Sequence, residues 1–238
     1  MSSITKQISR KALIWAIAIV AALVVLALRA DRHMVDFSDH LEETVVTVDE
    51  TEVPLQELGY YIMETEEYVY QLAEIYNPTD TMQFWRLHFN GIFIITEAKN
   101  SAMNTCIRDN VYCLEAEAAG MSLTDEEIAA VEEDVADLLD GLSYKQQQSL
   151  QYDAQSLQPI LEKVALARKY ANSLLESVDW TDYDQTPEVA VEIDGDYYEE
   201  VLATHDVVIN KKLWKKISLG SITISKVDLP PEDDEDEE

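Results

Sequence analysis

The histidines of this chain, and the residues that a catalytic site would need beside them, show no recognised catalytic spacing. The four histidines are His33, His40, His88 and His205. None belongs to an HExxH pattern, in which two histidines one helical turn apart bind zinc, and none accompanies a serine or cysteine nucleophile motif. A glycine-rich phosphate-binding loop is also missing from the sequence, which holds only six glycines. The sequence therefore predicts no catalytic residue and no cofactor.

Cysteines and acidic clusters could form a disulfide or bind a metal ion. Cys106 and Cys113 lie in one predicted helix, separated by about 10.5 Å along its axis, which is beyond the reach of a disulfide. We expect both to be buried as small apolar residues. The acidic stretches Asp179–Asp184 and Asp194–Asp196 offer the oxygen ligands that calcium prefers, but their spacing does not match an EF-hand. A solvated charged loop is the favoured interpretation, and no metal site is predicted.

The net charge narrows the range of partners. The chain of 238 residues has 47 acidic and 17 basic residues, for a formal net charge of −30. Such a chain repels nucleic acid and anionic lipid, so neither is expected as a partner. An acidic surface favours solubility and suits cationic or unfolded partners, although a solvated surface without any partner is the commoner explanation.

The N-terminal region predicts a membrane anchor. An unbroken apolar run over 12–28 has three basic residues before it and two after it. A helix of this length spans about 25 Å, and Lys11 and Arg29 at its ends can snorkel across the rest of a hydrocarbon core of about 30 Å. A retained signal anchor is favoured over a cleaved signal peptide, because the run is long and lacks a clear small-x-small cleavage site. No cysteine follows the run, which excludes a lipoprotein.

The bias of basic residues places the N-terminus inside the cell. We therefore expect a single-pass protein of the cell membrane whose body lies on the extracytoplasmic side. The expected parts are a cytoplasmic N-terminus at 1–11, the membrane span at 12–28, a linker at 29–43, a folded body at 44–225 and a disordered acidic tail at 226–238.

The first half of the body reads as a short strand pair followed by helices. Apolar and polar residues alternate over 46–53 around the turn sequence Asp49–Thr51, which predicts two short strands. Helical spacing then predicts a helix over 55–76, opened by Pro54 and stopped by the proline-containing sequence that follows it. A longer helical region is expected over 82–119, with the Asn-Gly pair inside it as a candidate break.

A helical corner follows. Gly120 fits the left-handed position after a helix end, and Thr124 fits the N-cap of a new helix. Glu127 completes a capping box, while Leu123 and Ile128 can form a hydrophobic staple across the cap. This combination predicts that one helix ends, the chain turns, and a second helix begins.

The second half of the body alternates helices with extended pieces. A helix is expected over 143–177 and a strand or short extended piece over 188–193. A short helix, a strand over 206–210 and an amphipathic segment complete the body. The strands at its two ends can pair, so the sequence predicts a mainly α-helical domain closed by a small β pairing of its N- and C-terminal segments.

Two stretches resemble the N-terminal domain of SurA/PrsA-type foldases. "VVTVDETEVPLQELGYYI" resembles the strand that leads into the first helix of that domain, and "LEAEAAGMSLTDEEI" resembles its helix–corner–helix signature. "DVVINKKLWKKI" is similar to its returning C-terminal segment. The resemblance covers Thr44–Ile217 and implies a SurA N-terminal-like helical domain that binds peptides.

The sequence also departs from that family. Glu52 stands where the family often has glycine or a small polar residue. A parvulin isomerase domain has about 90 residues of mixed strand and helix, and the segment between Ser177 and Val207 is too short for one. The resemblance therefore implies the chaperone scaffold without the isomerase, and a proline-peptide assay is expected to show no rate above background.

Aromatic residues and methionine in the first helix suggest a peptide-binding surface. These residue types suit promiscuous binding because they adapt at small entropic cost. The candidate peptide-binding residues are Tyr60, Tyr61, Met63, Tyr68 and Trp85. Packing of the same residues in the core of the helical bundle is the alternative interpretation.

The sequence thus predicts a membrane-anchored extracytoplasmic chaperone that binds unfolded or newly exported polypeptides without catalysis. The cleft between the two arms of the helical corner is its expected working surface. The alternatives are a peptidyl-prolyl isomerase with true activity and a membrane-tethered assembly protein with one fixed partner.

Overall fold

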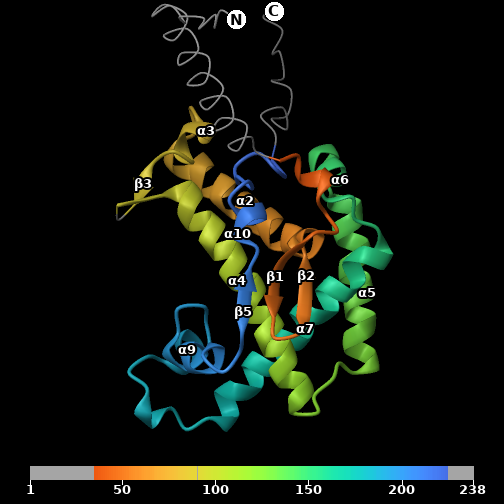
Figure 1. Ribbon diagram of the computed structural model, residues 1–238, viewed down its shortest axis with the longest axis vertical. Coiled ribbons are helices and arrows are strands. Elements are labelled where there is room, and N and C mark those ends of the chain that lie inside the picture. Colours follow the sequence, from red (N-terminus) through yellow and green to blue (C-terminus); the bar gives the residue numbers. More distant parts are fainter. Residues whose placement is uncertain (1–34, 90, 225–238) are drawn as a thin grey trace, which may run out of the picture. The chain divides into compact units, whose positions relative to one another are not determined.

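The computed structural model describes residues 35–89 and 91–224, so the predicted anchor at 12–28 and the predicted tail at 226–238 lie outside the described residues. This part of the chain is mainly helical and includes two small antiparallel sheets (Figure 1). The α-helices are α2 (Leu55–Tyr76), α3 (Thr81–Phe84), α4 (Ile94–Ala118), α5 (Asp125–Gly141), α6 (Tyr144–Leu150), α7 (Ala154–Ser177), α8 (Pro187–Ala190), α9 (Asp196–Leu202) and α10 (Lys211–Trp214). The strands are β1 (Thr44–Val48), β2 (Thr51–Pro54), β3 (His88–Phe89), β4 (Ile92–Phe93) and β5 (Val207–Ile209). Among these residues, no helix combines the length and apolarity needed to cross a bilayer.

The larger sheet joins the two ends of the described body. Its strand order is β2-β1-β5, and both pairings are antiparallel. Asp49 takes a positive φ of 53° in the β1–β2 turn, and its carboxylate accepts a hydrogen bond from the backbone N–H of Asp206. Val46 and Val48 are fully buried on the face of β1 that packs toward α4. The predicted pairing of N- and C-terminal strands is confirmed.

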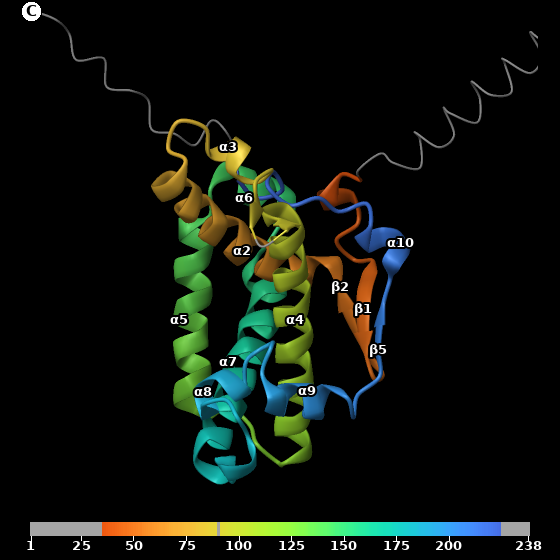
Figure 2. The same ribbon diagram turned by 90° about the vertical axis from the view of Figure 1, so that its left-hand side faces the viewer.

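Three helices form the centre of the body. Helix α7 packs on α4 on one side and on α5 on the other, and Figure 2 shows α5, α7 and α4 in a row. Apolar residues of α5 and α7 interdigitate in a cluster formed by Val131, Val135, Leu157 and Leu161. The space between the arms of the corner, which the sequence predicts as the working surface, thus holds α7 and a cavity of about 180 Å³ lined by α2, α5 and α7.

The corner itself has the predicted geometry. Gly120 has a φ of 72°, and the backbone N–H of Met121 bonds to the carbonyl oxygen of Ala116, which closes the end of α4. At the start of α5, the Thr124 hydroxyl accepts from the N–H of Glu127, and the Glu127 carboxylate accepts from the N–H of Thr124. The helix–corner–helix prediction is confirmed.

Two of the predicted long helices are interrupted. The region 82–119 contains α3 and a β3–β4 hairpin before α4 begins, and Gly91 has a φ of 85° in the hairpin turn. The region 143–177 is divided into α6 and α7 because Gln151 adopts a left-handed conformation, with φ 50°, and Asp153 then caps α7. The candidate break at the Asn-Gly pair is confirmed at Gly91, although the sequence did not predict a hairpin there. The prediction of one helix over 143–177 was wrong, because the turn at Gln151 interrupts a periodicity that continues on either side.

The prediction of an extended piece over 188–193 was also wrong. Pro187 occupies the first position of α8, where its missing N–H costs nothing, and Thr186 precedes it in extended conformation. The short helix at α9, the strand β5 and the start of α2 at Leu55 agree with the sequence predictions.

A buried polar network fixes α2, α4 and α7 together. Lys163 of α7 donates to Glu57 of α2 at 2.6 Å and to the side-chain oxygen of Asn110 of α4 at 2.8 Å. Asn110 in turn donates to Glu57 at 2.9 Å, so the three side chains satisfy one another. A closed network of this kind fixes how the three helices are rotated against one another. If one helix shifted by one residue, a buried charge would lose its partner.

Candidate binding surface

The five sequence-predicted binding residues do not lie on one surface. Tyr61, Met63 and Trp85 are buried, with exposed fractions of 4%, 1% and 3%, whereas Tyr68 is 62% exposed. Tyr60 is half-buried and lines a small cavity beside α5. The structure thus places three of these residues in the interior, as in the alternative interpretation, and separates the other two.

The buried members of this set have structural contacts. The Tyr61 hydroxyl donates to the Asp109 carboxylate at 3.2 Å, and burial raises the pKa of Tyr61 well above its ordinary value. The Trp85 ring lies against Gly220, where an added Cβ would approach it to 3.0 Å. Among the described residues, the Trp85 indole nitrogen has no hydrogen-bond partner. These contacts show that Tyr61 and Trp85 hold α4 and the C-terminal segment in place.

Exposed apolar residues gather in a single stretch of the described chain. Ten large hydrophobic side chains are exposed among residues 35–89 and 91–224, and seven of them belong to α2 or to the α3–β4 region that follows it. We call this set the apolar end; its members are Tyr68, Ile75, Tyr76, Leu87, Phe89, Ile92 and Phe93. Tyr68 is the one sequence-predicted binding residue in it.

Local structure explains why these side chains face outward. Tyr68 and Ile75 lie seven residues apart, which places them on one face of α2, and Tyr76 is the last residue of the helix. Val69 and Ala73 are buried, whereas Glu74, Ile75 and Tyr76 are all exposed. The exposure of Ile75 and Tyr76 therefore belongs to the C-terminal end of α2.

The β3–β4 hairpin carries the rest of the apolar end. Each strand has two residues, and such a short hairpin is not stable by itself. Backbone hydrogen bonds from Ile94 to Leu87 and from Ile95 to Trp85 attach it to the start of α4. Phe89 is 72% exposed at its tip. The hairpin is thus held at its base and presents apolar side chains to solvent.

A sequence signal for this hairpin was available. An Asn-Gly pair between apolar residues is the strongest short-range indication of a two-residue β-turn, because both turn positions need positive φ. The sequence "HFNGIFI" has this pattern. The helical periodicity on both sides concealed it, so the pair was interpreted as a break within a helix.

Two cavities flank α7, and both have charged walls. One has a volume of about 300 Å³ and includes Arg108, Arg168 and Glu192 in its lining. The other has about 180 Å³ and includes Tyr60, Glu64 and Arg168. Their charged linings make them poor sites for an apolar peptide segment.

Burial changes the acidity of several groups in the described interior. Burial raises the pKa of Cys113 to about 11, and it raises the pKa of Cys106 as well, so neither thiol is a ready nucleophile near neutral pH. Asp109 is buried beside Arg108, and desolvation raises its pKa. In the described part of the chain, no group of three or more histidine, cysteine or acidic side chains is arranged to hold a metal ion.

The chain was compared with protein families, curated proteins and solved structures. No protein-family model, no curated protein and no solved structure matches this chain.

Proposed function

We propose that the chain binds unfolded or newly exported polypeptides without catalysis, as a holdase-like chaperone on the extracytoplasmic side of the cell membrane, tethered by residues 12–28. The observation that carries this proposal is the apolar end, which gathers seven exposed hydrophobic side chains within α2 and the segment up to Phe93. Exposed apolar side chains gathered in one part of a domain mark surfaces that another molecule covers.

The composition of the apolar end suits varied partners. It combines three aliphatic side chains with two tyrosines and two phenylalanines, which contribute large contact area through few rotatable bonds. Contacts of this kind depend little on the sequence of the partner, so low specificity is expected. The net charge of −30 would keep a complex with an aggregation-prone polypeptide in solution.

The resemblance to SurA/PrsA-type foldases supports the same function. The matching stretches form a strand that leads into a long helix, a capped helical corner, and a returning strand that pairs with the first strand. These features are the ones that the resemblance leads us to expect of a peptide-binding domain.

Suppression of aggregation tests the proposal. The full-length protein in detergent or nanodiscs should delay the aggregation of an unrelated unfolded protein. Replacing Ile75 and Phe89 by glutamine should weaken this effect by about tenfold, which corresponds to roughly 1.4 kcal/mol of binding free energy. Both side chains are more than 70% exposed, so folding stability should change little.

A matched control uses exposed apolar residues elsewhere on the body. Tyr144 and Val189 are 73% and 50% exposed and lie outside the apolar end. Their replacement by glutamine should leave aggregation suppression unchanged. An equal loss in both variants, or no loss in either, would show that the apolar end is not the binding surface. Recovery of one stoichiometric partner in place of many clients would instead favour an assembly protein.

A further inference from the structure

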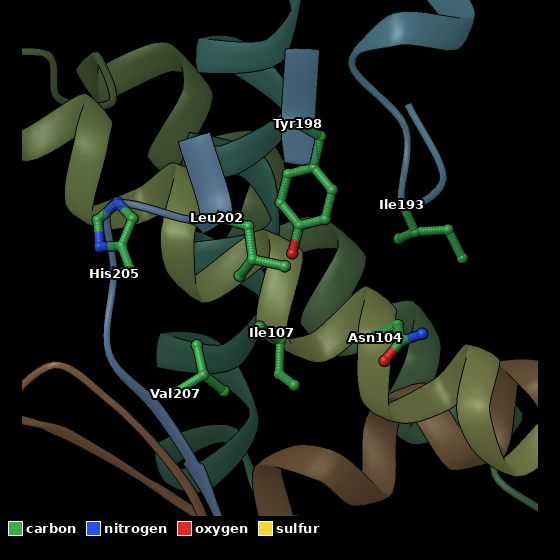
Figure 3. A pocket seen from close by; sticks show the side chains of 7 residues that line it. All are labelled: Asn104, Ile107, Ile193, Tyr198, Leu202, His205 and Val207. Carbon is green, nitrogen blue, oxygen red and sulfur yellow. The ribbon is translucent and has the colours of Figure 1, made fainter. Parts of the chain in front are cut away.

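A third cavity lies beside the free edge of β5, away from the apolar end. It has a volume of about 340 Å³ and is bounded by α4, α9 and the chain around β5 (Figure 3). Its lining residues are Asn104, Ile107, Ile193, Tyr198, Leu202, His205 and Val207. Figure 3 shows side chains from these elements surrounding a common space. The volume is at the lower end of the range for ligand sites and fits one large apolar side chain.

The walls of this cavity are mostly apolar and firmly held. Tyr198 is 2% exposed, and its ring packs edge-on against the ring of Tyr112 at a centroid distance of 5.6 Å. His205 at the margin contacts the carboxylates of Asp49 at 2.7 Å and Glu115 at 3.2 Å, which hold the imidazole in place. A preformed apolar cavity of this kind accepts a side chain without reorganisation.

β5 pairs with another strand on one side only. The N–H of Asn210 bonds to the carbonyl of Val45, and the carbonyl of Asp206 accepts from Asp49, so the even-numbered residues of this stretch face β1. Because hydrogen-bonding directions alternate along a strand, the backbone groups of Val207 and Ile209 point away from β1. β5 is the last strand of its sheet, so no other described strand pairs with these groups.

The side chains of β5 show which way an added strand would face. Val207 lies opposite Val48 and Ile209 lies opposite Val46, both of which are fully buried against the helices. Val208 faces the other side and is 57% exposed. A strand added beyond β5 would therefore direct every second side chain toward α4, and the residue beside Val207 would enter the cavity.

We propose that this edge is a binding site for an extended polypeptide segment, which adds to the sheet antiparallel to β5 and places an apolar side chain in the cavity. The ligand class is a strand with apolar residues at alternate positions. This inference rests on the proposed function, because it names the conformation in which one part of a client is held. Main-chain pairing supplies affinity and the cavity supplies selectivity, as in other cases of strand addition.

Charge fixes the direction of the bound strand. Lys211 and Lys212 follow β5 directly and are exposed, in a chain whose net charge is −30. In an antiparallel arrangement, the N-terminal residues of the ligand lie beside the C-terminal end of β5 and hence beside these lysines. The site therefore favours a segment with acidic residues before its alternating apolar residues.

Fluorescence anisotropy with labelled ten-residue peptides and the full-length protein tests this site. The first peptide has two glutamates at its N-terminal end, followed by leucine alternating with threonine. The second has N-methylleucine in place of its central leucine, and the third has the glutamates at its C-terminal end. The leucines lie opposite Val207 and Ile209, so their N–H groups are the ones that pair with β5. The first should bind at least about tenfold more tightly than the second, because the methyl group removes a pairing donor and keeps the side chain. The third should bind more weakly than the first, and tighter binding of the third would overturn the proposed direction.

Protein variants separate pairing from the cavity. Ile209→Pro removes an outward N–H and leaves the bonds to β1 in place, and Leu202→Gln makes the cavity polar. Each should weaken binding of the first peptide by about tenfold, whereas Val208→Gln on the exposed face should have little effect. If Ile209→Pro fails to fold, amide exchange in the wild-type protein decides: the peptide should slow exchange at Val207 and Ile209.

Unchanged exchange at these amides, or equal binding by all variants, would overturn the strand-addition site. Such a result would leave the proposed function standing, because aggregation suppression is tested through Ile75 and Phe89, which lie outside this cavity. Conversely, unchanged aggregation suppression after replacement of Ile75 and Phe89, with the first peptide still bound through the β5 edge, would contradict the role of the apolar end alone.

Discussion

Glu66 is fully buried in α2 although its side chain is a carboxylate, and its partners explain why this is tolerated. The two carboxylate oxygens accept from the backbone N–H groups of Gly220, Ser221, Ile222 and Thr223, and from the Thr223 hydroxyl. Five donors offset the cost of removing the charge from water. One side chain thereby fastens the C-terminal segment to the first long helix.

Replacement of Glu66 by glutamine should therefore destabilise the protein. The amide keeps one acceptor oxygen but turns its NH₂ group toward backbone donors, which leaves some of them unpaired. We expect the free energy of unfolding in urea to fall by about 3 kcal/mol. Glu67 is the next residue and is exposed, so Glu67→Gln is the control. This change should alter the free energy of unfolding by less than about 0.5 kcal/mol. Similar unfolding curves for both variants would contradict this account of Glu66.

Residue types in α2 were informative about the helix but not about which side chains are exposed. Tyr61, Met63 and Tyr68 have similar chemistry and belong to one helix, yet two are buried and one is exposed. The difference arises because α4, the sheet and the C-terminal segment cover part of α2 and leave its end uncovered. Long-range contacts of this kind leave no local trace in the sequence, so the candidate residues could not be sorted in advance.

At the scale of elements, the corner between α4 and α5 is attached to α7 by a charge. The Glu127 carboxylate, already part of the capping box, also accepts from the Lys169 ammonium at 2.6 Å. Lys169 donates to the carbonyl of Ser122 as well. The hydrogen bond to Lys169, followed by that to the Thr124 backbone, lowers the pKa of Glu127 below its ordinary value of 4.5.

This shift predicts a dependence of stability on pH. Between the lowered pKa and 4.5, the unfolded chain binds a proton at Glu127 that the folded chain does not bind. The stabilisation by Glu127 is thus fully present above pH 4.5 and is lost as the pH falls through the lowered pKa. Glu127→Gln keeps an oxygen for the capping box but has no charge to titrate.

Urea unfolding at several pH values measures the effect. The wild type should be more stable than Glu127→Gln at pH 7, and the difference should shrink as the pH falls below 4.5. Glu126 is an exposed neighbour in the same first turn, so Glu126→Gln controls for the general effect of one fewer negative charge. If the difference in stability between the wild type and Glu127→Gln did not vary with pH, the ion pair with Lys169 would contribute nothing to the stability of the folded state.

Sequence reasoning at this scale succeeded where local chemistry decides the structure. Capping residues and Gly120 specified the corner, and alternation specified β1 and β2. It failed at Gln151, where a periodic pattern continues across a turn, and at Gly91 it predicted a candidate break but not the hairpin; both residues have positive φ. The residue type of Gln151 does not indicate a turn, because a non-glycine residue adopts the left-handed conformation only when the surrounding structure requires it.

At the scale of the whole body, the two ends of the described chain hold each other. β5 pairs with β1, and the stretch that follows α10 buries Ile217, Leu219 and Ile222. Lys99 of α4 also donates to the carbonyls of Trp214 and Ile217. The C-terminal segment thus contacts both α2 and α4, and contacts between residues far apart in sequence close the fold.

Truncation tests the importance of this closure. A chain ending at Lys216 loses the partners of Glu66 and the three buried aliphatic side chains, each of which stabilises the folded state by roughly 1.5–3 kcal/mol. The sum is comparable to the whole stability of a typical domain, about 5–15 kcal/mol, so we expect this chain to lose cooperative unfolding. A chain ending at Ile224 keeps every contact described above and should unfold cooperatively like the full-length protein.

Circular dichroism during urea titration distinguishes the chain ending at Lys216 from the chain ending at Ile224. A cooperative transition in the chain ending at Lys216 would mean that the helices fold without their closing segment, and that the buried Glu66 is not essential to the fold.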